Sequence, residues 1–239
     1  MINLLILRNK KKFMSINCSE CENRSSCFNE LSINELNKIS EKKSEIVYKK
    51  GEIIIKQNTF ASHIYFIKKG LVKIYLENKK KNLIIEIAGQ GAMLGLSSLN
   101  YNNKYNFSVS AISDVEACEI DIEFLNTIAN NNVGFSSNII TQLNGMLDKL
   151  MSKVNCLSQK DLRSRTAELL IDFADNVYKS SKFEIELSRN ELAELTNMAV
   201  ENIVRVLKEF DSLNYISLKG KNIEITDYNK LKEIASIYR

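Results

Sequence analysis

The stretch SRNELAELTNMAVENIVRVLKEF, residues 188–210, decides the fold of this chain. Ser188 is followed three residues later by Glu191, a capping box that predicts the start of a helix. Residues 196–198, Thr-Asn-Met, interrupt the apolar pattern, and asparagine is one of the few types besides glycine that adopts the left-handed conformation. Apolar residues at helical spacing then predict a second helix. These residues are Ile203, Val206, Leu207 and Phe210.

The two predicted helices lie between β-type segments. A helix over about residues 162–179 and a short strand, FEIEL, precede them, and the strand pair YISLKG–KNIEIT follows. Gly220 lies at the turn of that pair. Two short helices joined by three residues, with a hairpin behind them, predict a winged helix-turn-helix, which reads DNA with its second helix.

The outer face of the second helix has residue types that read base edges. Glu201 can accept a hydrogen bond from cytosine N4, Arg205 can donate to guanine O6 and N7, and Val204 suits a thymine methyl group. Nearby lysines would contact phosphates and fix the register. The predicted DNA-binding residues are Val200, Glu201, Val204, Arg205, Lys208, Lys219 and Lys221. As an alternative, Glu201 and Arg205 form an ordinary surface ion pair one helical turn apart.

The net charge gives no independent support for DNA binding. The chain has 33 Lys and Arg against 29 Asp and Glu residues, a net charge of +4. Four basic residues in segment 1–15, which holds no acid, account for this excess, whereas segment 160–239 has a net charge of −1. The predicted DNA-binding part is therefore not basic overall, and its residue pattern must carry the prediction.

A narrow apolar stripe predicts a dimerisation helix over residues 131–159. Its members are Ile140, Leu143, Leu147, Leu150, Val154 and Leu157. Their spacing alternates between three and four residues, the a/d pattern of a parallel coiled coil, and no charged residue occupies it. An amphipathic helix packed on its own domain is the alternative, but its stripe is usually broader. We therefore predict a homodimer.

Residues 45–123 contain short β-rich runs broken by glycine, such as EIVYKKGEIIIKQ and HIYFIKKGLVKIYLE. Strands of this length and spacing predict a sandwich or a barrel-like roll, and the whole chain is predicted to be α+β. The predicted units are an N-terminal segment 1–27, a β-roll 28–130, the dimerisation helix 131–159 and a winged helix-turn-helix domain 160–239.

Several of these stretches resemble one family, the CRP/FNR transcription regulators. LSRNELAELTNMAVENIVRVLKEF is similar to the family's helix-turn-helix. YKKGEIIIKQN, IYFIKKGLVKIY and VEACEIDIEFL are similar to its cyclic-nucleotide-binding-type β-roll, a double-stranded β-helix or jelly roll. The similarity runs from about Cys18 to Leu231. It implies a sensor function for the roll, a homodimer on near-palindromic double-stranded DNA and, for an activator, contact with RNA polymerase.

The recognition helix resembles the FNR branch of that family. The shared pattern is Val-Glu-x-x-x-Arg, starting at Val200. Two positions depart from it: Val204 stands where serine is usual, and Asn197 stands where glycine is common in the turn. The resemblance therefore implies the fold and the dimeric DNA binding, but not the usual target sequence.

The roll lacks the residues that hold cyclic AMP in those members of the family that bind it. They have a glutamate directly after a glycine and, within about ten residues, an arginine followed by serine or threonine. Here no acid follows Gly95, and near Phe107 there are Asn106 and Ser108 but no arginine. A buried cyclic phosphate without a cation is costly, although Lys104 is a potential substitute. No cyclic AMP is therefore expected, whereas another small ligand in the roll stays an alternative.

Four cysteines form the second sensory feature. Cys18, Cys21 and Cys27 lie within ten residues of each other, and Cys118 lies in VEACEID. The FNR branch holds an oxygen-sensitive 4Fe–4S cluster with such a set, so the resemblance implies these four residues as ligands. Soft thiolate ligands match iron. Two alternatives remain open, a structural zinc ion on the same thiolates and no metal at all.

The remaining residues predict no enzyme and no membrane protein. No acid–base or nucleophile constellation stands out, and a Cys18/Cys21 thiol–disulfide exchange pair lacks the βαβ setting that this chemistry uses. His63 has no companion histidine, and Cys156 has no partner by this pattern, so neither is assigned a metal. No apolar run approaches a membrane span and the start lacks a signal-peptide pattern, so cytoplasmic localisation is expected.

Overall fold

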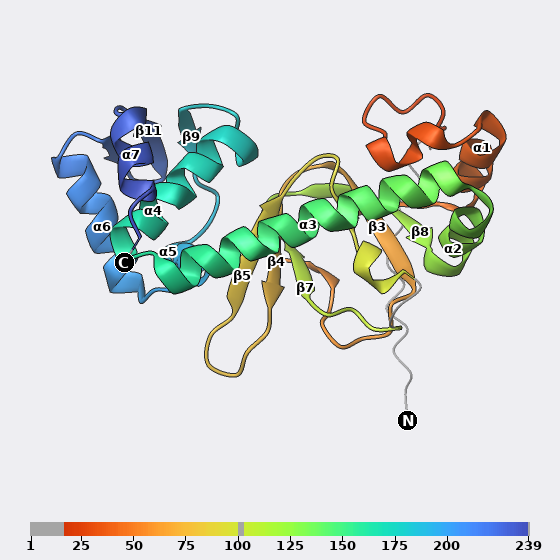
Figure 1. The fold of residues 1–239 in the computed structure, drawn as a ribbon, viewed down its shortest axis with the longest axis horizontal. Coiled ribbons are helices and arrows are strands. Elements are labelled where there is room, and N and C mark those ends of the chain that lie inside the picture. The colour runs from red at the N-terminus through yellow and green to blue at the C-terminus, as the bar shows by residue number, and fades with distance from the viewer. Residues whose placement is uncertain (1–16, 100–102, 239) are drawn as a thin grey trace.

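The computed structural model describes residues 17–99 and 103–238 (Figure 1). The basic segment 1–15, and with it most of the predicted N-terminal unit 1–27, lies outside the described residues. One long helix, α3 (Val133–Gln159), runs between a β-roll at one end of the molecule and a mostly helical unit at the other. We call this helical unit, residues 160–238, the head.

Two antiparallel four-stranded sheets form the roll, which confirms the predicted fold. One sheet has the order β1 (Ser44–Tyr48), β8 (Val115–Asp121), β3 (His63–Lys69), β6 (Met93–Leu94). The other has the order β2 (Ile53–Ile55), β7 (Ser108–Ala111), β4 (Val72–Leu76), β5 (Leu83–Ala88). The short helix η2 (Leu96–Ser98) follows β6.

A glycine is required where β3 turns into β4. Gly70 has a φ of +91°, and a Cβ added there would lie 2.3 Å from the carbonyl oxygen of Asp114. Only glycine combines this backbone conformation with so close an approach. The turn brings β3 and β4, which belong to different sheets, together at one edge of the roll.

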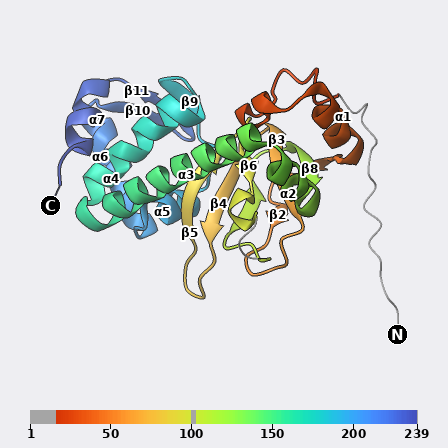
Figure 2. The ribbon, with the colours of Figure 1, turned by 45° about the vertical axis from the view of Figure 1, so that its right-hand side comes forward.

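Three short helices pack around the roll beside the start of α3. They are η1 (Ser26–Glu30), α1 (Ile33–Lys42) and α2 (Ile122–Asn131), and Figures 1 and 2 both place α1 and α2 near the first turns of α3. The long helix begins two residues after its predicted start at residue 131. Asn132 has an extended backbone, and its side chain accepts a hydrogen bond from the N–H of Phe135, so it caps α3.

The head contains the predicted helix-turn-helix and wing. Its elements are α4 (Leu162–Asp172), η3 (Phe173–Val177), β9 (Lys182–Glu184), α5 (Arg189–Thr196), α6 (Val200–Ser212), β10 (Ile216–Lys219), β11 (Asn222–Ile225) and α7 (Tyr228–Ala235). The helix predicted to residue 179 is α-helical only to Asp172 and continues as the π-helical turn η3. Tyr178 follows this turn and stacks on Phe183 with 4.9 Å between the ring centroids, which fixes how the chain leaves the helix.

Two apolar cores stabilise the molecule. The first lies in the roll and includes buried residues of the N-terminal segment and of the first turns of α3. The second fills the head, yet it also contains four residues of the roll. These are Tyr75, Ile84, Ile87 and Ile112. The head and the second sheet of the roll therefore share buried apolar contacts.

Candidate nucleic-acid interface and cysteine segment

The helix-turn-helix forms as its sequence predicts. The Ser188 hydroxyl accepts a hydrogen bond from the N–H of Glu191 at 3.2 Å, and the Glu191 carboxylate accepts one from the N–H of Ser188 at 2.8 Å. Asn197 ends α5 in the left-handed conformation, with a φ of +50°. This turn directs the chain out of α5 and into α6.

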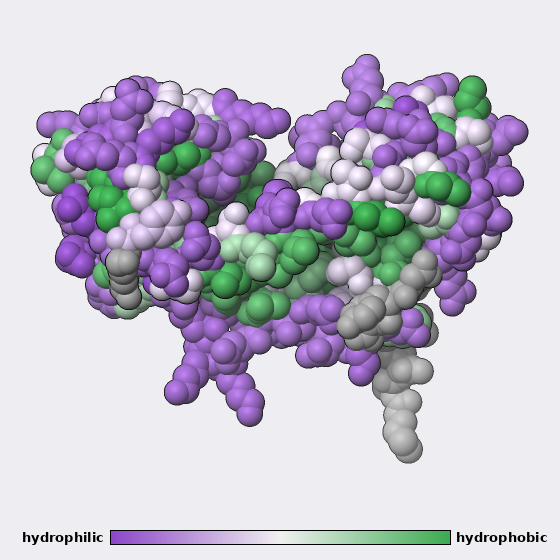
Figure 3. Space-filling view, in the orientation of Figure 1, coloured by the Kyte–Doolittle hydropathy of each residue, from purple (hydrophilic) through white to green (hydrophobic). Residues whose placement is uncertain are grey.

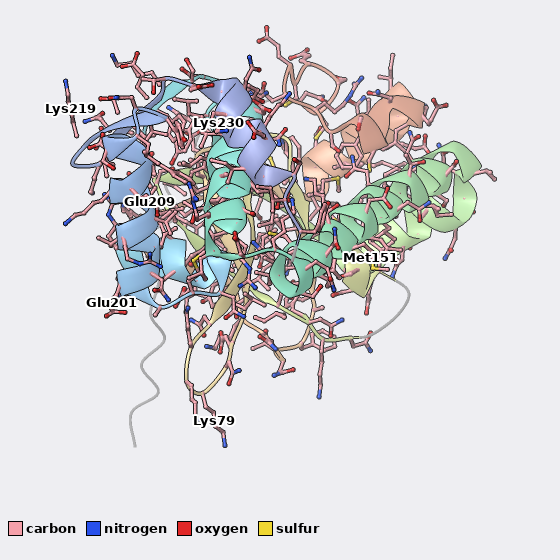
Figure 4. All side chains as sticks on the ribbon, turned by 60° about the vertical axis from the view of Figure 1, so that its left-hand side comes forward. Lys79, Met151, Glu201, Glu209, Lys219 and Lys230 are labelled. Carbon is pink, nitrogen blue, oxygen red and sulfur yellow. The ribbon has the colours of Figure 1, made fainter. Side chains whose placement is uncertain are left out.

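One face of α6 is buried and the other is open. The buried residues are Ile203, Val206, Leu207 and Phe210. On the other face Glu201, Arg205 and Lys208 are exposed, while Val200 and Val204 are half-buried. Within the described part of the chain, Glu201 and Arg205 form no ion pair with each other. Their charged groups therefore face solvent, and Figure 4 shows Glu201 at the outer edge of the head.

The wing lies beside α6. Gly220 has a φ of +65° at the turn between β10 and β11, and the flanking Lys219 and Lys221 are exposed. Figure 4 shows Lys219 at the outer edge of the head. Arg189, the first residue of α5, donates from Nη2 to the carbonyl oxygen of Gly220 at 2.9 Å. No sequence pattern indicates Arg189 for this position, because the wing lies 31 residues further along the chain.

The predicted dimerisation residues divide into two groups. Ile140, Leu147, Leu150 and Val154 have exposed fractions between 42% and 58%, whereas Leu143 and Leu157 are half-buried and Leu143 packs on the roll. Figure 3 shows an apolar band along the middle of the molecule, where Figure 1 places α3. Two further apolar residues, Val133 and Met151, are 86% and 63% exposed on the same helix. We call the four exposed predicted residues together with these two the seam.

Cys18 and Cys118 lie near one another beside a buried lysine. Both thiols interact electrostatically with Lys43, whose side chain is only 2% exposed and whose Nζ lies 2.9 Å from the Glu45 carboxylate. Burial raises the pKa of Cys118 to about 11, although the charge of Lys43 opposes that rise. The structure thus brings two of the four predicted ligands together.

The other two cysteines lie elsewhere on segment 17–31, which we call the cysteine segment. The sulfur of Cys27 lies 3.8 Å from the carbonyl oxygen of Asn138 on α3, and burial raises the pKa of this thiol. Cys21 is half-buried. Residues 17–99 and 103–238 contain no group of three or more Cys, His, Asp or Glu side chains arranged to hold a metal ion. In this conformation the four cysteines do not form one site.

The cysteine segment packs closely on α3. Gln142 donates from Nε2 to the Ser26 hydroxyl at 3.1 Å, and the rings of Phe28 and Phe135 have centroids 5.8 Å apart. A Cβ added at Gly134 would lie 2.8 Å from the Cβ of Glu30, so the glycine permits this approach. A change in the path of the cysteine segment would therefore alter its packing on α3.

Two protein-family models match the chain. Residues 45–132 match the cyclic nucleotide-binding domain, and residues 164–234 match the Crp-like helix-turn-helix domain. Together they span about two thirds of the chain. The chain belongs to the CRP/FNR family. The members of this family bind DNA and act as dimers.

Known CRP/FNR proteins match nearly the full length. The Anaerobic regulatory protein of Haemophilus influenzae is 23% identical, over 92% of this chain and 88% of its own length. The Fumarate and nitrate reduction regulatory protein of Escherichia coli (strain K12) is also 23% identical, over 92% of this chain and 91% of its own length. These relatives are transcription regulators and not enzymes, which confirms the prediction that the chain is no enzyme.

Solved structures share the fold. FixK2 from Bradyrhizobium japonicum superposes with a TM-score of 0.76 at 18% identity, covering 82% of this chain and 98% of FixK2. A putative transcriptional regulator of the crp/fnr family from Eubacterium rectale gives a TM-score of 0.75 at 19% identity, covering 90% of this chain and all of the other. In the part of the chain that the structure describes, no helix is long and apolar enough to cross a membrane.

In the roll of this CRP/FNR protein, the acid Glu77 lies beside Ser108, one of the residues found where cyclic-AMP-binding relatives have an arginine. Ser108 is fully buried, and its hydroxyl accepts a hydrogen bond from the N–H of Gln57 at 2.8 Å. The same hydroxyl donates to the Glu77 carboxylate at 2.5 Å, and Lys56 lies 2.7 Å from that carboxylate. The Ser108 hydroxyl is thus already hydrogen-bonded within the roll, to a carboxylate that is paired with Lys56. The absence of cyclic AMP binding stays a prediction.

Proposed function

We propose that this CRP/FNR protein is a homodimeric transcription regulator that binds near-palindromic DNA through α6 and the wing. The observation that carries the proposal is the open face of α6, where Glu201, Arg205 and Lys208 are exposed and unpaired with each other. Glutamate and arginine one turn apart suit a C–G step in the major groove. Lys219 and Lys221 on the wing are placed to contact phosphates.

The seam supports the dimer. It is an apolar surface along α3, and an isolated chain would leave it in contact with water. Two copies joined in parallel along this surface would present two α6 helices to successive major grooves, about 34 Å apart. Contact with RNA polymerase belongs to the same proposal if the protein is an activator.

Selection from a pool of random duplexes tests this function. The purified protein should enrich a near-palindrome with two half-sites, one helical turn apart, and should bind it as a dimer. Binding should weaken steeply with salt, because lysines and arginines displace ions from the phosphates. Enrichment of no sequence, or of a single half-site bound by one chain, would contradict the proposal.

We further propose that the cysteine segment is the sensory element and that its three cysteines, with Cys118, hold a 4Fe–4S cluster. The donor chemistry supports the proposal, since four thiolates suit iron. The arrangement in this structure does not fit the group, because only Cys18 and Cys118 lie together. A cluster-bound form therefore requires the cysteine segment to take a different path, and its packing on α3 would carry that change to the dimerisation helix.

Anaerobic purification with iron and sulfide assays checks the cluster. We expect about four irons and four sulfides per chain, with a visible absorption that disappears in air. Cys27→Ser should abolish the iron, while Cys156→Ser, a matched buried thiol outside the predicted set, should retain it. Stoichiometric zinc in a colourless protein would mean that these cysteines form a structural zinc site and hold no cluster. A protein free of both metals would move the search to a ligand in the roll.

A further inference from the structure

Helix α5, the first helix of the helix-turn-helix, is bound at both ends by lysines from outside the head. At its first turn, Lys73 on β4 lies 2.7 Å from the Glu191 carboxylate, with side chains only 19% and 23% exposed. Burial alone would raise the pKa of Glu191, but hydrogen bonds from Lys73 and Ser188 outweigh burial and hold the pKa below its ordinary value. The carboxylate of the capping box therefore also binds the roll.

Two lysines bind the other end of α5. Lys81, in the loop between β4 and β5, donates to the carbonyl oxygen of Ala193 at 2.9 Å and to that of Met198. Lys153 on α3 donates to the carbonyl oxygen of Leu195 at 2.6 Å. The carbonyl groups at the C-terminal end of a helix carry partial negative charge, so ammonium groups stabilise this end.

Apolar packing holds the same surfaces together. Tyr75 on β4 and Ile84 and Ile87 on β5 are buried in the core of the head. This contact partly shields the lysine bonds from water, which makes each bond stronger than it would be on an open surface. Figure 4 shows the β4–β5 loop extending beyond the packed region, with Lys79 at its tip pointing into solvent.

We infer that Lys73, Lys81 and Lys153 form a clamp that sets the orientation of α6 relative to the roll and α3. The clamp acts on α6 through the turn at residues 197–199, because Lys81 bonds the carbonyl groups of Ala193 and Met198 on both sides of Asn197. Lys81 and Lys73 are thus positioning residues. Since their ammonium groups already bind α5, they are not phosphate contacts.

The clamp also offers a second route from the roll to the DNA-binding face. The first route is α3, whose end leads into the head. The second is the β4–β5 hairpin, whose strands belong to the sheet that forms one wall of the roll. A shift of this sheet on ligand binding would move α5 directly, since Lys73 and Lys81 are carried by the hairpin.

The preferred spacing of the DNA half-sites is the readout that distinguishes a positioning role of these lysines from a direct contact with DNA. This test rests on the proposed DNA binding. With the selected operator, Lys81→Met should lower the affinity about tenfold, from the loss of charge-assisted bonds. It should also reduce the discrimination against operators with one or two inserted base pairs between half-sites, because the heads are less fixed. The dependence on salt should stay unchanged, whereas loss of a phosphate contact would reduce its slope by about one.

Lys79→Met is the matched control, a lysine of the same loop that is exposed. It should leave the spacing preference of the wild-type protein intact. Lys73→Met should behave like Lys81→Met, since it releases the other end of α5. An unchanged spacing preference in both clamp variants, or a salt slope reduced in Lys81→Met, would overturn the clamp.

Hydrogen exchange without DNA keeps the clamp testable if the protein binds no operator. The amides of Asn197 and Met198 donate to the Ala193 carbonyl that Lys81 also binds. In Lys81→Met these two amides should exchange faster, while those in the middle of α6 should not change. Equal exchange in the wild type and the variant would reject the clamp, independently of whether DNA binding is found.

Discussion

Arg205→Ala is expected to lower the affinity for the selected operator by about 5- to 150-fold, the effect of losing one bidentate contact with guanine. The side chain is exposed on the open face of α6 and forms no ion pair with Glu201 in the described structure. Its removal therefore costs the fold little, and the loss should appear in binding alone. Fluorescence anisotropy at fixed salt, with thermal unfolding on the same samples, measures both.

The control for Arg205 is Lys232→Ala, which removes an exposed cation from α7 in the same head. It should bind DNA nearly as well as the wild type. Compared with the wild type, Arg205→Ala should discriminate less against operators in which the contacted base pair is changed, because the residue that reads that pair is gone. An affinity unchanged by Arg205→Ala would mean that α6 does not read the DNA in this way.

Leu147→Glu is expected to convert the dimer to monomers and to lower operator affinity by about 100-fold or more. Leu147 lies near the middle of the seam and is 54% exposed. In a two-fold dimer the substitution places two carboxylates opposite each other in an apolar interface, where neither has a partner. DNA affinity falls because the second half-site is no longer bound intramolecularly. Sedimentation equilibrium gives the oligomeric state.

Asn155→Glu is the matched control, because it adds the same charge to an exposed position of α3 outside the seam. It should remain dimeric and bind the operator. A Leu147→Glu protein that is still a dimer would show that the two copies meet on another surface.

Local rules account for the parts of the fold that the sequence predicts well. The capping box at Ser188, the left-handed Asn197 and the glycine of the wing each depend on neighbours within a few residues. The strand pattern of the roll and the helical spacing of apolar residues in α3 are equally local. Val133 lies seven residues before Ile140 but is not included in the predicted stripe, because the stripe position between them is the polar Ser136.

Contacts between distant segments are what the sequence does not predict. Lys73 and Lys81 lie more than 110 residues before their partners on α5, and no periodicity links them. The cysteines show the same limit. Their spacing indicates a ligand set, yet the packing of Cys27 on α3 depends on Gly134 and Phe135, which a motif does not contain. Residue type defines the chemistry of a site, and tertiary packing decides which groups meet.

The seam consists of apolar side chains without a single charge, and this gives the protein two unrelated sensitivities. Association through such a surface is driven by the release of water, so it weakens on cooling and hardly responds to ionic strength. The contact with DNA responds in the opposite way, since ions compete for the phosphates. Raising the salt concentration would thus release intact dimers from the operator, whereas cold would separate the copies first. Temperature and salt therefore act on different steps of the same assembly.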